Sequence, residues 1–424
     1  MFEKFSQIFR DKELRRKILF VLGILVVYRI MAAIPLIGID REAMAALMNQ
    51  NQALGILNVF TGGSMDKVSM IMLGLGPYIT ATIVIQLLTM IFPALEKIYK
   101  EEGEAGKKKI NQWGRIAAAP LAMLQGLAMI RIFQSQGIIA NLGMQELFVS
   151  LIALAGATVF LMWLGELITE NGIGNGISVL IFAGIISSVP ANIQSFIYTF
   201  DAAKIPYYLI FAMVSLFVIA AVVLINEGRR NIPVSYAKRV RGNKVYGGAS
   251  TYLPMNVNPA GVIPVIFAMA LMVLPQMVGG FLTNYGGIIG SIGSFMVNFL
   301  NNPLYSGIFL FFLVVVFTFF YTSVTFDPKN VADNLKKMGG FVPGIRPGES
   351  TAKFIKFILN RVQFVGAIFL GIIAILPSLI QGFTGVTNFR FLIGGTALII
   401  IVSVVLETMR QIKSHLHMRD YDRA

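Results

Sequence analysis

Apolar residues in this chain fall into long runs separated by shorter polar stretches. A helix needs about 20 apolar residues to cross the ~30 Å hydrocarbon core of a bilayer. Runs of that length predict ten membrane-spanning helices. The predicted spans are residues 18–38, 68–92, 114–134, 146–169, 176–199, 206–227, 259–282, 304–326, 357–380 and 387–409. An even number of spans places both termini on one side of the membrane.

The polar stretches between these runs differ in their basic residues. The two terminal stretches and every second connection hold 29 of the 35 Lys and Arg residues; they are 1–17, 93–115, 228–258, 327–361 and 410–424. Basic residues accumulate on the cytoplasmic side of membrane proteins. The pattern therefore predicts cytoplasmic termini. Arg29 lies inside a span, and we expect its long side chain to snorkel outward.

The composition is that of a polytopic membrane protein. Of 424 residues, 56% are apolar and 13% are charged, whereas a soluble domain carries about 25% charged residues. The orientation pattern explains most of the net charge of +14, so a nucleic-acid partner is not required. No cysteine is present, which excludes disulfides. The first apolar run follows KELRRK, but its length and the spans after it predict a retained helix rather than a signal peptide.

The spans and loops offer little reaction chemistry. Glu166, Glu227 and Glu407 lie near the cytoplasmic ends of spans, which disfavours a proton-coupled carrier, since such carriers keep ionisable groups near the midplane. GEAGKKK lacks the Walker A spacing, and GIGNG follows no strand as a dinucleotide fingerprint would. His415 and His417 lie in a basic tail without further ligands. We therefore expect no enzyme activity, metal or cofactor.

Two cytoplasmic stretches, 228–258 and 327–356, are longer and more varied than orientation alone requires. Each mixes basic residues with Tyr, Phe, Pro and Gly. Docking of a partner outside the membrane and simple attraction of a solvated basic loop to anionic lipid both account for this composition.

A short half-polar stretch, Asn58 to Met65, precedes the second span. It is too short to cross the bilayer, yet it carries Val59, Phe60 and Met65. Irregular backbone at membrane depth occurs only where protein buries it or water lines it. A segment that enters from outside and stops part-way fits this rule, and an ordinary external loop is the alternative.

Several motifs follow one another in an order typical of one family. They are FTGGS, LGLGPYITATIVIQLL, LMWLGELITENGIGNGIS, YAKR, AGVIPVIFA, ADNLKKMGGFVPGIRPGE and GGTALIIIV. By these motifs the chain resembles the SecY family of protein-conducting channel subunits over nearly its whole length. The resemblance implies an all-α membrane fold of ten transmembrane helices in two inverted-repeat halves, 1–200 and 201–424, with a short re-entrant plug helix at about 56–67.

The resemblance also implies a function. It predicts a passive channel of the bacterial inner membrane that passes unfolded secretory polypeptides and releases membrane-protein helices sideways. The implied partners are SecE- and SecG-type small membrane subunits, a SecA-type motor ATPase, the ribosome, signal sequences, nascent polypeptides and the lipid bilayer. A small-solute transporter and a membrane assembly factor without a pore are the alternatives.

The resemblance assigns residues to four roles. Its plug residues are Phe60, Thr61, Gly62, Gly63, Ser64 and Met65. Its pore ring is Leu75, Ile79, Ile181, Ile266 and Ile400, with Leu75 where Ile is commoner in the family. Spacing alone also places Ile177 and Val262 on the helix faces of Ile181 and Ile266, and helix packing or lipid contact explains any single aliphatic residue equally well.

The other two roles belong to polar residues. Thr82 and Gln86 are candidates for a lateral gate between the second and seventh spans, and a satisfied interhelical hydrogen bond is the alternative for both. The residues assigned to motor or ribosome docking are Arg230, Tyr236, Lys238, Arg239 and Arg346. Asn231 stands where some relatives carry a basic residue, which weakens the assignment of that loop.

Overall fold

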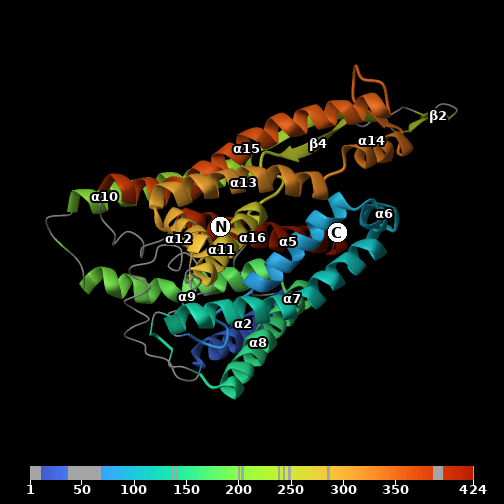
Figure 1. Ribbon diagram of the computed structural model, residues 1–424. Coiled ribbons are helices and arrows are strands. Elements are labelled where there is room, and N and C mark those ends of the chain that lie inside the picture. Colours follow the sequence, from blue (N-terminus) through green and yellow to red (C-terminus); the bar gives the residue numbers. More distant parts are fainter. Residues whose placement is uncertain are drawn as a thin grey trace.

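A computed structural model gives the architecture of the chain (Figure 1). It describes residues 11–36, 68–135, 137–139, 142–198, 201, 205–236, 239–241, 244–246, 250–283, 287–384 and 395–423. Within these ranges the protein is a bundle of α-helices with a small β-structured unit at one end.

A helix occupies the core of each predicted span. The helices are α2 (Lys12–Ala33), α5 (Gly76–Ile91), α7 (Gly103–Ser135), α8 (Met144–Asn171), α9 (Gly176–Tyr198), α10 (Ile205–Glu227), α11 (Ile263–Leu282), α13 (Pro303–Thr325), α15 (Glu349–Thr384) and α16 (Gly395–Arg423). By length and composition, the described ranges hold six membrane-crossing helices, or seven if α5 and its bent neighbour form one span. The predicted fold class agrees with this architecture, and the count of ten stays a prediction.

Three helices lie in stretches that the sequence assigned to connections. They are α6 (Pro93–Glu101), α12 (Gly287–Asn301) and α14 (Pro328–Lys337). The first of them turns by 108° from α5. In addition, α7, α15 and α16 continue beyond their predicted spans. In Figure 1, α6, the start of α7 and α14 gather at one end of the molecule, which is the end rich in basic residues.

Short polar side chains fix several helix starts. The Asp11 carboxylate accepts hydrogen bonds from the backbone N–H groups of Glu13 and Leu14, and Asp327 does the same at α14. Asn302 accepts from the N–H of Leu304 at the start of α13. These side chains satisfy N–H groups that have no partner within the helix.

The two long stretches that were predicted to be cytoplasmic form a sheet, which the sequence interpretation missed. Strands β1 (Arg229–Tyr236), β4 (Ser250–Asn256) and β5 (Gly340–Phe341) are antiparallel in the order β4-β1-β5. A separate hairpin pairs β2 (Arg239–Arg241) with β3 (Lys244–Tyr246). Because β1 comes from the first stretch and β5 from the second, one folded unit contains both.

This unit, which we call the cytoplasmic unit after the predicted location of its two stretches, has its own hydrophobic core. The buried members come from β1, β4, α14, the turn after β5 and the start of α15; they are Ile232, Val234, Met255, Leu335, Val342, Ile355 and Leu359. Burial alternates along β1, as expected for a strand with one covered face. The unit therefore rests on the end of α15 that projects beyond the predicted span (Figure 1).

The turn between α8 and α9 depends on close backbone packing. A Cβ atom on Gly176 would lie 1.8 Å from the carbonyl oxygen of Gly165. The Thr169 hydroxyl donates to that carbonyl and accepts from the Gly176 N–H, both at 2.9 Å. The Gly174 N–H donates to Oε1 of Gln411 at 2.7 Å. The GIGNG motif is thus a helix–helix turn anchored to α16.

Candidate functional site

The five predicted ring residues lie together in the largest hydrophobic cluster of the molecule. Their exposed fractions lie between 1% and 5%. They come from four helices: Leu75 and Ile79 from the start of α5, Ile181 from α9, Ile266 from α11 and Ile400 from α16. None of the five carries a charge or a polar side-chain atom.

The four helices that carry the ring residues meet in two pairs. Helix α5 contacts α11, and α9 contacts α16. Each pair joins one helix from the predicted first half to one from the predicted second half. The ring residues therefore lie where the two halves meet, although each predicted half is a continuous length of chain.

Helices α5 and α11 begin with the same turn. Gly74 and Gly261 have positive φ angles of 55° and 63°, which favour glycine, and a proline follows each at the first turn of the helix. Ile79 donates its N–H to the Leu75 carbonyl at 3.0 Å, and Ile266 donates to the Val262 carbonyl at 3.3 Å. Ile79 and Ile266 stand at equal spacing from the two glycines, so the repeated turn brings both to equivalent positions.

The predicted plug residues, Phe60 to Met65, lie outside the described residues. The chain on either side of that stretch is described. Leu36 donates its N–H to the Val68 carbonyl at 2.9 Å, and Met70 donates to the Ile34 carbonyl at 3.0 Å. This antiparallel bridge holds the end of α2 against the start of the predicted second span.

The two predicted gate residues on α5 differ in their polar contacts. The Thr82 hydroxyl donates to the Tyr78 carbonyl at 2.9 Å, and Thr82 packs against Gly114 of α7. Oε1 of Gln86 is buried and accepts no hydrogen bond from the described residues. Thr82 therefore faces the flanking helix rather than α11, and the unpartnered Gln86 oxygen weakens packing locally. Their role in a gate stays a prediction.

The predicted docking residues fall in the cytoplasmic unit. Arg230 is exposed on β1, and Tyr236 ends the same strand opposite Gly340. Arg239 begins β2, and Lys238 lies outside the described residues. The sheet thus connects loops that are distant in sequence and carry the predicted docking residues.

Arg346 lies in the turn between β5 and α15, between two glycines with positive φ angles. Gly344 and Gly348, on either side of it, have φ angles of 81° and 101°. Val342 is buried and Ile345 half-buried in the core of the unit, whereas Arg346 is exposed. The Thr351 hydroxyl donates to the Arg346 carbonyl at 2.9 Å. The backbone is anchored on both sides, which leaves the guanidinium to project into solvent.

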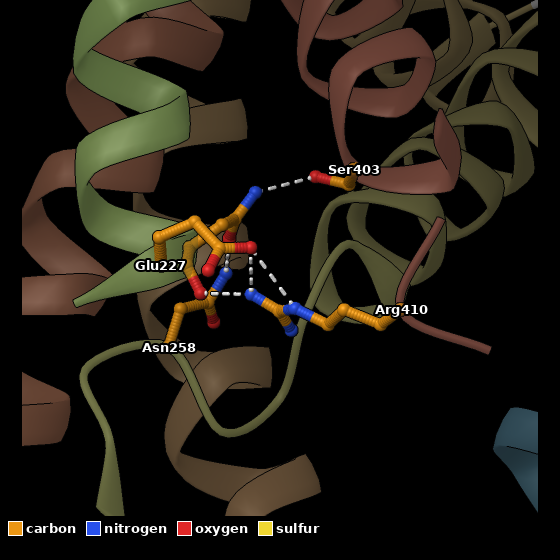
Figure 2. Close-up of polar contacts among 5 residues, drawn as sticks. Glu227, Asn258, Ser403 and Arg410 are labelled. Atoms are coloured by element: carbon orange, nitrogen blue, oxygen red, sulfur yellow. Dashed lines mark hydrogen bonds and ion pairs between the residues drawn. The ribbon is translucent and has the colours of Figure 1, made fainter. Parts of the chain in front are cut away.

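A polar network joins the cytoplasmic unit to the helices that carry the ring residues (Figure 2). Asn258 donates from Nδ2 to Oδ1 of Asn226 at 2.9 Å, and Asn226 donates to the Ser403 hydroxyl at 2.9 Å. All three side chains are buried. Arg410 adds an ion pair to Glu227 at 2.9 Å.

The network residues border the sheet and the helices. Asn226 and Glu227 end α10 just before β1, and Asn258 follows β4 just before the turn into α11. Ser403 lies one turn beyond Ile400 on α16. From the sequence, no role was assigned to Asn226, Asn258 or Ser403; Glu227 was noted only as a carboxylate at a span end, and Arg410 was counted in the orientation pattern. The one local sign in the sequence was the Asn258-Pro259 pair, because Asn-Pro often begins a turn.

Two of the three carboxylates at span ends have basic partners. Glu227 pairs with Arg410, and Glu166 of α8 pairs with Arg115 of α7. Among the described residues, no group of three or more His, Cys, Asp or Glu could hold a metal ion. The polar groups near the ring thus connect helices.

Comparison with known proteins identifies the family. Residues 69–409 match the SecY family. The chain belongs to the SecY family. It is 40% identical to the protein translocase subunit SecY of Mycobacterium tuberculosis over 444 aligned residues, covering 100% of this chain and 99% of that protein. The Streptomyces coelicolor protein of the same name is also 40% identical, over 439 aligned residues with the same coverage. The resemblance inferred from the motifs is therefore confirmed.

Solved structures of SecY and Sec61 channels share the fold. One described as a protein-conducting channel has a TM-score of 0.65 at 20% identity and covers 93% of this chain, which covers 91% of it. Sec61 in a canine ribosome–channel complex has a TM-score of 0.60 at 20% identity, with the same coverage. Together with the SecY relatives, these matches show that the chain has the fold of SecY and Sec61 channels.

Proposed function

We propose that this SecY-family chain forms a passive pore for unfolded polypeptides, sealed by the ring of Leu75, Ile79, Ile181, Ile266 and Ile400. The observation that carries the proposal is that these five aliphatic side chains belong to one buried cluster, and that the four helices that carry them contact one another in pairs across the two predicted halves. A constriction without charges excludes ions by dewetting. Flexible aliphatic side chains close around any extended chain without reading its sequence.

The two halves act as an inverted repeat that opens along α5 and α11. The repeated turn at Gly74 and Gly261 supports the repeat, since it gives the two helices equivalent starts. Opening between them gives an apolar segment access to lipid. Ten leucine-like residues favour the bilayer by about 5 kcal/mol, at about −0.5 kcal/mol each. Gln86, with its unpartnered oxygen, lies at the gate. Thr82, also on α5, lies beside the gate and faces α7.

Residues 56–67 serve as a plug on the external side, with Phe60 to Met65 filling the idle pore. The hydrogen bonds between Ile34–Leu36 and Val68–Met70 support this role. They fix both ends of the intervening stretch beside the start of α5, which is adjacent to the ring. Gly62-Gly63 lets the plug turn and detach.

The cytoplasmic unit docks the partner that drives transport, a SecA-type motor ATPase or the ribosome. Two solved relatives are ribosome-bound channels, one canine and one the yeast Ssh1 complex on the 80S ribosome. Exposed Arg230 and Arg346 support contact with phosphates or acidic side chains. SecE- and SecG-type subunits complete the assembly in the bacterial inner membrane, with both termini in the cytoplasm.

Site-directed crosslinking of a stalled secretory chain tests the pore. A photoreactive residue at Ile79 or Ile181 should capture the stalled polypeptide. Val84 and Ile186 are matched controls on the same helices, since they are 41% and 43% exposed on the outer surface. Those positions should capture lipid. Capture of the polypeptide equally well at the control positions would remove the proposed pore axis.

A further inference from the structure

An open pocket lies between α13 and α15, beside the part of α15 on which the cytoplasmic unit rests. Its volume is about 390 Å³, and its lining residues are Phe319, Phe357, Asn360, Arg361 and Phe364. Three phenylalanines make most of the wall, and one cation and one amide supply the polar groups. Pockets of roughly 300–1,000 Å³ with this mixture of groups bind small organic ligands.

The cation of this pocket lies against an aromatic ring. The Arg361 guanidinium carbon lies 4.3 Å from the centroid of the Phe357 ring on the preceding turn of α15. This contact holds the guanidinium at the pocket without neutralising its charge. Among the described residues, no carboxylate pairs with Arg361, so its hydrogen-bond donors remain available to an anion.

The charge around the pocket is positive. Helix α13 contains no charged residue, and α15 contains no acidic residue after Glu349. Lys353 and Lys356 are exposed on the two turns of α15 that precede Arg361, and Lys353 pairs with Glu349 at 3.0 Å. Basic side chains thus lead from the cytoplasmic end of α15 to Arg361, just inside the predicted span.

The two helices that form the walls of the pocket are held together by a hydrogen bond. Gln363 donates from Nε2 to the Thr318 carbonyl at 3.2 Å, and both side chains are buried. This bond ties α15 to α13 directly behind the pocket, while Phe357 and Phe364 are 53% and 54% exposed on its outer side. The pocket therefore opens toward the surroundings of the helix bundle.

We propose that this pocket binds an anionic phospholipid. The Arg361 guanidinium and the Asn360 amide hold the phosphate, and the phenylalanine side chains contact the glycerol region and upper acyl chains. Lys353 and Lys356 add attraction at the headgroup level, as basic residues do at the anionic cytoplasmic leaflet. An acidic peptide would place charged side chains against the outward-facing phenylalanines, whereas a phospholipid places acyl chains there. The leaflet follows from the proposed orientation, while the binding itself does not depend on it.

Fluorescence quenching by brominated lipids tests the site in the full chain. A Phe364→Trp variant is reconstituted into phosphatidylcholine vesicles that contain increasing fractions of acyl-brominated phosphatidylglycerol or acyl-brominated phosphatidylcholine. The signal of the unmodified chain, which has two tryptophans, is subtracted. We expect half-maximal quenching at an about fivefold lower fraction of the anionic lipid.

Two further variants decide whether the pocket causes the preference. Arg361→Gln in the Phe364→Trp background should make both lipids quench alike. Arg16→Gln is the matched control, since Arg16 is an exposed basic residue at the same membrane face on α2, and it should keep the preference. Equal quenching by both lipids without the Arg361 change would overturn the proposal. So would a preference that survives Arg361→Gln in a variant with an unchanged unfolding temperature.

Since vesicles present both leaflets, the result does not depend on which way the channel inserts. The crosslinking test of the pore is likewise independent of this pocket, so failure of one proposal leaves the other standing.

Discussion

At the residue scale, individual aliphatic side chains make the centre of this protein apolar. Spacing alone could not separate ring residues from packing residues on the same helix face. Ile177 shares a face with Ile181, yet it packs against Gly165 of α8, where its Cγ1 lies 3.4 Å from a Cβ position on that glycine. The family resemblance assigns Ile181 to the ring. Ile181 is buried in the same cluster as the other four predicted ring residues, and its role in the ring stays a prediction.

A polar ring residue should make the idle channel leak. Ile266→Asn places an amide in the buried cluster, where it attracts water and lowers the barrier to ions. We expect a severalfold rise in ion conductance across a planar bilayer. Ile266→Val keeps the side chain aliphatic and is the control. Equal conductance of the two variants would show that Ile266 does not line the seal.

The close approach at Gly176 should tolerate no side chain. Gly176→Ala sets a Cβ against the Gly165 carbonyl, which is backbone and cannot move aside cheaply. Overpacking of this kind costs about 1–3 kcal/mol or more, so the unfolding temperature should fall. Gly156→Ala on α8 is the matched control, because no atom lies within 4 Å of its Cβ position. A fall of the same size in both variants would contradict this account.

At the scale of elements, the helices at the cores of the predicted spans could be predicted and the sheet could not. Long apolar runs locate helices reliably, because the bilayer fixes their length. The sheet was hidden for two reasons. Pro233 interrupts the pattern of β1, yet it is tolerated because β5 pairs only with Ser235 and Tyr236. The other reason is that β1 and β5 are far apart in sequence, so no local pattern predicts that they pair.

The positive charge of Arg346 should be necessary for transport that a motor drives. Arg346→Glu reverses an exposed charge without touching the core of the cytoplasmic unit, so the protein should still fold and insert. We expect motor-driven export of a secretory protein to be abolished in reconstituted vesicles. Lys337→Glu makes the same charge change on α14 of the same unit and should retain most export. Normal export by the Arg346 variant would refute the docking role.

The buried asparagine pair should couple the sheet to α11. Asn258→Leu leaves Oδ1 of Asn226 without its donor, which costs about 1–3 kcal/mol of unfolding free energy. Changing both residues to Leu removes the pair together and should cost less than the sum of the single changes. A double-mutant cycle in detergent measures this difference. Strict additivity would mean that the hydrogen bond contributes nothing.

At the scale of the whole molecule, the helices that carry the proposed ring come from both predicted halves and contact one another in pairs. The contacts of α5 with α11 and of α9 with α16 are long-range, so a span list cannot reveal them. The repeated glycine turn could have been noticed in LGLGPY and AGVIP, but only positive φ angles show that it is the same turn. The polar network then joins this centre to the cytoplasmic unit, because it links the end of α10, the turn into α11 and Ser403 on α16.

The ring and the plug should act as two barriers in series. Deleting Thr61–Met65 removes the external barrier, and we expect ion conductance of the idle channel to rise while the aliphatic ring still limits it. Combining the deletion with Ile266→Asn removes both barriers, so its conductance should exceed the sum of the two single effects. Planar-bilayer recordings of the four proteins measure this. If the deletion variant conducts like the intact chain, and the combined variant conducts like Ile266→Asn alone, residues 61–65 do not block the pore.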